Sequence, residues 1–144
     1  MTTICGAVRC NSRGAASSNL AIQIPLIAQD FPEIADVHHG TINLHLDRML
    51  LVLTSDYRSK GISWGKPNDP EVFDFLRIKL EAPEGAAAIN AWIYIAHGSP
   101  HRMTPGVHEI IAPKLQIADR DRCKFHISRP CIELQFYFQL VVVL

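Results

Sequence analysis

Alternation of apolar and polar residues is the most regular feature of this chain. In residues 132–144, apolar side chains occupy every second position, with glutamate, glutamine and tyrosine between them. A period of two is typical of a β-strand with one covered face. Less regular signals of the same kind occur at residues 3–10, 19–24, 41–46, 49–54, 72–80, 89–96 and 122–127. The pattern therefore predicts a protein built mainly from short strands.

Two stretches differ from simple alternation. Residues 89–96, INAWIYIA, are apolar at both sets of alternating positions, which indicates a central strand covered on both faces. The only helical signal follows Pro25, which suits a first helical turn, and its short apolar stripe is soon interrupted by Pro32.

Turns rich in glycine and proline separate these stretches, and none is long enough to link two domains. We therefore expect residues 1–144 to form one domain. Closure of a sheet removes its exposed edges, so the expected fold is mainly β, a closed or nearly closed barrel of about seven or eight strands with one or two short helices.

Composition narrows the range of partners. Lys plus Arg and Asp plus Glu number 14 each, so no overall field favours nucleic acid or an anionic membrane. The last apolar stretch is shorter than the ~20 residues that a membrane helix needs. The first ten residues, MTTICGAVRC, do not form a secretory signal, and we expect a cytoplasmic protein. The four cysteines fit no zinc or redox spacing, which favours reduced and mostly buried thiols.

The stretch GTINLHLD at residues 40–47 carries the clearest candidate chemistry. Its alternation places Thr41, Asn43, His45 and Asp47 on one face of a strand. Thr41 and Asn43 would offer neutral oxygens about 7 Å apart along the strand. A hard cation such as Mg2+ accepts such oxygens when a phosphate supplies negative charge. The same pattern also suits a half-solvated strand, which is the commoner case.

Other candidate groups have equally ordinary interpretations. His97, His101 and His108 surround a loop rich in proline and glycine, and they can line a pocket with Glu109 as general base. Glu109 can instead be a structural carboxylate that binds loop amides. The five cations and two anions of residues 114–129 can face a phosphate or form an ordinary solvated surface.

Two segments together resemble a known family. GTINLHLDR at residues 40–48 resembles the Gly-Thr-Leu-Asn-Leu signature of the CTP-dependent riboflavin kinases of archaea, and HEIIAPKL at residues 108–115 resembles their Glu-Ile-Ile-Ala-Pro segment. The order and separation of the two segments agree with the family, and a weaker match includes the start of the chain. The resemblance extends over about residues 6–127, but only the two short motifs are specific.

The resemblance implies a cradle-loop β-barrel that transfers the γ-phosphoryl group of CTP to the terminal ribityl hydroxyl of riboflavin, making FMN. It implies Mg2+ binding by Thr41 and Asn43, and flavin contact by Glu109, which would also act as the catalytic carboxylate. The corresponding nucleotide-binding positions are Asn11, Arg13, Gly14, Lys114 and Leu115, and the remaining flavin-binding positions are His101 and Thr104.

The sequence departs from this family at three places. The first loop has one glycine where the family alternates glycines, the segment after Pro113 is shorter, and His101 stands at the flavin-binding threonine. Two classes of function therefore stay open. One is a divergent riboflavin-kinase-like phosphotransferase with flavin and pyrimidine-nucleotide substrates, and the other is a non-catalytic module that binds such a small ligand. An apolar final strand can also pair between subunits, which makes a homo-oligomer possible.

Overall fold

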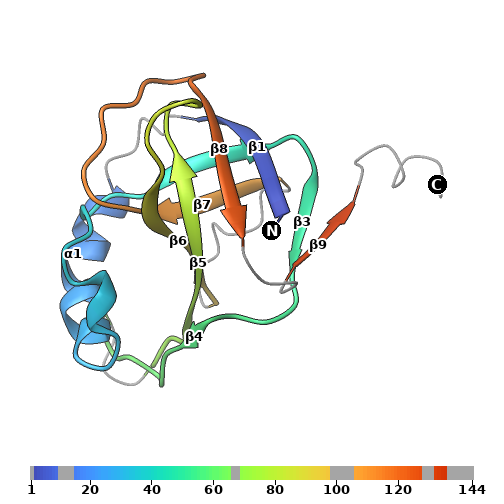
Figure 1. The fold of residues 1–144 in the computed structure, drawn as a ribbon. Helices are drawn as coiled ribbons and strands as arrows, with labels where there is room; N and C mark the ends of the chain where they lie inside the picture. The colour runs from blue at the N-terminus through green and yellow to red at the C-terminus, as the bar shows by residue number, and fades with distance from the viewer. Residues whose placement is uncertain (1, 10–14, 66–68, 98–105, 128–131, 136–144) are drawn as a thin grey trace.

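Six antiparallel strands close into a barrel in the computed structural model, which describes residues 2–9, 15–65, 69–97, 106–127 and 132–135 (Figure 1). They are β1 (Thr2–Val8), β2 (Ile42–Leu46), β5 (Phe73–Glu81), β6 (Ile89–Ala96), β7 (Val107–Ile111) and β8 (Arg122–Ile127). Their order is β5, β6, β7, β2, β1 and β8, and the pairing of β8 with β5 completes the circle. The expected mainly-β barrel is confirmed.

The remaining elements lie outside this ring. Strand β4 (Tyr57–Arg58) pairs with β5, and β3 (Met49–Val52) pairs with β9 (Ile132–Gln135) in a separate two-stranded ribbon. Helix α1 (Ala15–Ala28) is followed by a 3-10 turn, η1 (Pro32–Ile34). In Figure 1, α1 and the β3–β9 ribbon lie on opposite sides of the barrel.

The inside of the barrel is an apolar core made by alternate residues of every strand. Because successive side chains of a strand point to opposite faces, these positions are two residues apart. The fully enclosed members include Leu44 and Leu46 of β2, Ile93 of β6, Ile110 of β7 and Phe125 of β8.

A second apolar cluster lies between the outer face of the barrel and α1 with η1. Helix residues such as Leu20, Ile24 and Ile27 pack there with Trp92 and Tyr94 of β6. Strand β6 therefore contributes to both clusters, with Ala91 and Ile93 on the inner face. This confirms the prediction of a central strand covered on both sides, and it makes Trp92 a core residue.

The prediction of a strand at residues 19–24 is wrong, because these residues belong to α1. Leu20, Ile24 and Ile27 are buried at intervals of four and three residues, which is helical spacing, whereas Ile22 is 49% exposed. Pro25 lies inside this helix rather than at its start. The helix is thus longer than the sequence pattern indicated, because contact with the barrel decides which residues are buried.

Two described strands, β4 and β7, were not predicted from alternation, and β7 is too short and too mixed for a clear period. The predicted final strand begins as expected at Ile132, but residues 136–144 lie outside the described part of the chain.

Cys123 is buried and Cys5 half-buried, and both are free thiols. Burial raises the pKa of Cys123 to about 11. No helix within the described ranges is long and apolar enough to cross a membrane.

Candidate functional site

Three oxygen-bearing side chains meet on the outer face of β2 and β7. Asn43 of β2 is the cross-strand partner of Glu109 of β7, and Thr41 directly precedes β2. Their neighbours Leu44 and Ile110 are fully buried inside the barrel. Asn43 and Glu109 therefore project outward, away from the barrel core. The predicted alternation of the GTINLHLD stretch is confirmed at this strand.

The three side chains lie within reach of one another without forming short bonds. The Thr41 hydroxyl is 3.3 Å from Glu109 Oε1 and 3.5 Å from Asn43 Oδ1. Hydroxyl hydrogen bonds usually measure about 2.7–2.8 Å, so both contacts are weak. All three residues are half-buried. The arrangement collects a hydroxyl, an amide oxygen and a carboxylate in one partly shielded place.

This donor set fits a hard divalent cation. Neighbouring oxygens around one Mg2+ at about 2.0–2.1 Å lie ~2.9 Å apart, a few tenths of an ångström closer than the oxygens here. In the described part of the chain, no group of three or more His, Cys, Asp or Glu side chains is arranged to hold a metal ion. A cation at this site would therefore depend on the neutral oxygens of Thr41 and Asn43 and on negative charge brought by a ligand.

Tyr94 extends the row on the other side of Glu109. It is the cross-strand partner of Glu109 on β6, and its hydroxyl donates a 2.6 Å hydrogen bond to Gln23 Oε1 of α1. Burial raises the pKa of Tyr94, and the negative charges of Glu109 and Glu71 raise it further. Tyr94 is therefore a neutral phenol at physiological pH, and it links the Glu109 strand to the helix.

A hollow of about 340 Å³ borders the Asn43 strand. It is lined by Ala7, Val8, Arg9, His45, Asp119 and Arg120. His45 is the next outward residue after Asn43, and the Arg9 amide donates a 2.8 Å hydrogen bond to the Asn43 carbonyl oxygen. Arg9 and Arg120 thus line this hollow, and the Arg120 side chain, which is 93% exposed, lies 3.9 Å from the Asp119 carboxylate. Arg120 belongs to the basic stretch of residues 114–129, a candidate for phosphate contact from the sequence, whereas Arg9 was not predicted.

The other predicted site residues either lie outside the group of Thr41, Asn43 and Glu109 side chains or fall outside the described residues. Lys114 is exposed after β7, and the half-buried Leu115 packs against the barrel core. His108 is half-buried on β7, and burial lowers the pKa of its imidazole. The predicted positions in the first loop and in the histidine-rich loop lie outside the described residues: Asn11, Arg13, Gly14, His101 and Thr104.

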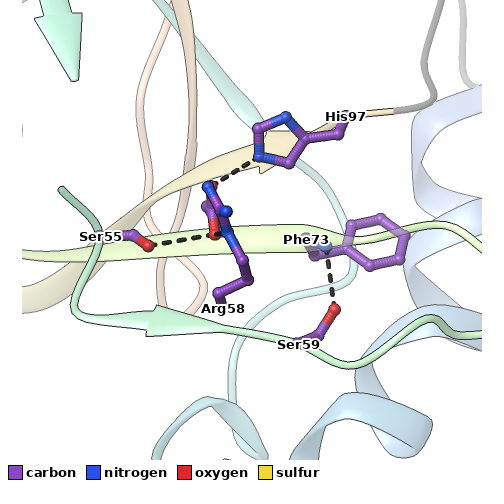
Figure 2. A network of polar contacts seen from close by, with 6 residues as sticks. Ser55, Arg58, Ser59, Phe73 and His97 are labelled. Carbon is purple, nitrogen blue, oxygen red and sulfur yellow. Dashed lines mark hydrogen bonds and ion pairs between the residues drawn. The ribbon is translucent and has the colours of Figure 1, made fainter. Parts of the chain in front are cut away.

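A second polar cluster surrounds Asp74, whose side chain is only 4% exposed. Its partners Ser55, Arg58 and His97 are labelled in Figure 2. Arg58 binds its carboxylate through two nitrogens at 2.8 and 2.9 Å. Ser55 Oγ lies 3.1 Å from Oδ1, and His97 Nε2 lies 2.6 Å from Oδ2. Burial alone would raise the pKa of Asp74, but these hydrogen bonds outweigh burial and hold the pKa below its ordinary value.

Sequence reasoning missed the Asp74 cluster. The available signal was a carboxylate at position 74 inside the apolar run VFDFL. Position 74 is on the same face of the strand as Leu76, which belongs to the barrel core. Ionised carboxylates are rarely buried without partners. That signal predicts a partner, but it cannot name Arg58 or His97, which reach Asp74 only in the folded chain.

Comparison with known proteins assigns no family to this chain. No protein-family model matches this chain, and no curated protein matches it in sequence.

Proposed function

We propose that the Thr41, Asn43 and Glu109 site binds Mg2+ together with a pyrimidine nucleotide and transfers a phosphoryl group from CTP to riboflavin or a related acceptor. The proposal is supported by one observation above all. Two motifs separated by 68 positions in the chain bring Thr41 Oγ1 and Glu109 Oε1 to within 3.3 Å. These are the same two motifs that resemble the archaeal riboflavin kinases.

Phosphoryl transfer requires mainly positioning and neutralisation of charge, and little covalent chemistry from the protein. In this proposal, Thr41 and Asn43 hold the cation, which when bound neutralises the phosphate oxygens. Glu109 orients the acceptor hydroxyl and takes its proton. Both strands are part of a closed barrel, so the three side chains start from a rigid frame.

Incubation of the purified protein with riboflavin, CTP and Mg2+ tests the proposal, with FMN formation followed by chromatography. We expect FMN to form with CTP and much less with ATP, because a pocket shaped for a pyrimidine does not readily admit a purine. Glu109→Gln should lower turnover by about a hundredfold or more while leaving CTP affinity nearly unchanged. Glu84→Gln, at an exposed glutamate, is the matched control.

Binding without turnover is the second candidate function. It is favoured by the contact between Thr41 and Glu109, since a carboxylate that already accepts a hydrogen bond can be structural. Thermal shifts with riboflavin or CTP but no FMN would assign this function. A ligand at a hundredfold its dissociation constant stabilises a protein by about 2.7 kcal/mol, which such an assay detects. No FMN and no thermal shift with any of these ligands would contradict both candidates.

A further inference from the structure

A second hollow, of about 390 Å³, lies on the outer face of β5, β6 and β8, on strands other than those of the Thr41 site. It is lined by Glu33, Arg77, Ile78, Lys79, Asn90, Ala91, Trp92 and His126. Small-molecule sites have volumes of about 300–1,000 Å³, so this space suits a ligand of roughly one ring with a polar group. Its lining residues come from strands of the barrel and from η1.

Most charged groups in this hollow already have a partner of opposite charge. The Glu33 carboxylate accepts hydrogen bonds from Arg77 at 2.7 and 2.8 Å and from Trp92 Nε1 at 2.7 Å. His126 Nε2 lies 2.7 Å from Glu81 Oε2, and its Nδ1 lies 2.9 Å from Thr3 Oγ1. Arg77 and His126 therefore both have acidic partners, and most of their N–H groups already make hydrogen bonds.

Lys79 differs from these groups. It projects outward, since its neighbours Ile78 and Leu80 belong to the barrel core. Its ammonium donates a hydrogen bond to Asn90 Oδ1, a neutral oxygen, and no ion pair joins it to a carboxylate among the described residues. An ammonium has three donors and a carboxamide nitrogen has two, so the pair keeps donors for a ligand. The hollow thus holds one positive charge without a matching negative charge.

We propose that this hollow binds a small organic anion, a molecule of about one ring that carries a carboxylate or a phosphate group. The anion lies against the Lys79 ammonium and the Asn90 amide, and the ring lies along the edge of Trp92. Lys79 supplies the charge that attracts the anion, and the exposure of Lys79 and Asn90 to water weakens that attraction. This site is separate from the proposed phosphotransfer site, and its occupation does not depend on Mg2+.

Titration of the full chain with phenyl phosphate and with benzoate, followed by NMR chemical shifts, tests the proposal. Benzamide is the neutral control, and inorganic phosphate and acetate show whether the ring contributes. We expect at least one of the two aromatic anions to bind and to shift the signals of residues 77–79 and 90–92, and benzamide to bind at least about tenfold more weakly. Binding of phenyl phosphate alone identifies a phosphate ligand, whereas binding of both identifies an anion site in general.

Asn90→Asp is the decisive variant. It places a carboxylate beside Lys79 and removes the uncompensated charge, while an opposite-charge pair across two strands keeps the fold. We expect the anion affinity to fall about tenfold or more in Asn90→Asp and in Lys79→Met. Lys60→Met, at an exposed lysine of the β4 region, and Asn43→Leu should bind the anion as the unmodified chain does.

Two results would overturn the proposal. One is the absence of shifts at the lining residues with both aromatic anions. The other is equal anion affinity in Asn90→Asp and in the unmodified chain. Because Asn43→Leu removes only the Thr41 site, loss of Mg2+-dependent nucleotide binding in that variant, with anion binding retained, separates the two proposals.

Discussion

Asp74 of β5 and His97, which directly follows β6, are joined by a hydrogen bond of 2.6 Å between Oδ2 and Nε2. Arg58 and Ser55 complete the surroundings of the same carboxylate, so a buried anion connects three separate segments. The exposed ends of Arg58 and His97 face water, with side chains 66% and 36% exposed, whereas Asp74 is enclosed. Asp74 is therefore the enclosed member of this cluster.

The first prediction concerns the pH dependence of stability at Asp74. Its pKa in the folded protein lies below the ordinary value of about 3.9, so its contribution is complete above about pH 5 and is lost as the pH falls through the folded pKa. Asp74→Asn should lower the free energy of unfolding by about 1–3 kcal/mol at pH 7. Urea unfolding of both proteins from pH 7 to pH 3 should show the difference shrinking below about pH 4. A difference that stays constant over this range would contradict the prediction.

The second prediction concerns the oxygens of Thr41 and Asn43. Asn43→Leu should keep the fold, since Asn43 is only half-buried on the outer face, but it should abolish Mg2+-dependent binding of CTP or CDP. Thr41→Val should act in the same direction, because it removes the hydroxyl with little change of shape. Thr54→Val, at an exposed threonine, is the matched control. Calorimetric titration with and without Mg2+ makes the measurement, and unchanged binding in both site variants would exclude the cation site.

The third prediction concerns phosphate recognition by Lys114. If Lys114 contacts the phosphates, Lys114→Ala should weaken CTP binding, and added salt should weaken it in the unmodified chain. The reason is that exposed charges are screened over ~8 Å at physiological ionic strength. Lys60→Ala is the control at another exposed lysine. Affinity that is insensitive to both changes would assign the phosphates to other groups, and Arg9→Ala would then be the next variant to measure.

The fourth prediction concerns backbone conformation at Arg120. Its φ of 71° is in the left-handed region, which glycine adopts at low cost and other residues adopt at a cost of roughly 1–2 kcal/mol. Its side chain is 93% exposed, so little packing is lost on truncation. Arg120→Gly should therefore raise the free energy of unfolding by about 1 kcal/mol in urea denaturation. Arg120→Ala, which keeps the strain, should give no such gain.

Some of this structure could be predicted from the sequence alone. The period of two gave the mainly-β class, the two covered faces of residues 89–96 and the shared face of Thr41 and Asn43. These features are local, because a strand turns successive side chains to opposite faces wherever it is placed. A stretch of sequence can therefore be assigned its faces without knowledge of its neighbours.

Other features were decided only by the tertiary structure. Residues 19–24 form a helix because the outer face of β6 offers an apolar surface to Leu20 and Ile24, a contact that no local pattern contains. The register that sets Asn43 opposite Glu109, and the pairing of Lys79 with His126 that closes the barrel, join residues far apart in the chain. Register and closure depend on which long-range pairing buries the most apolar surface, and that is a property of the whole fold.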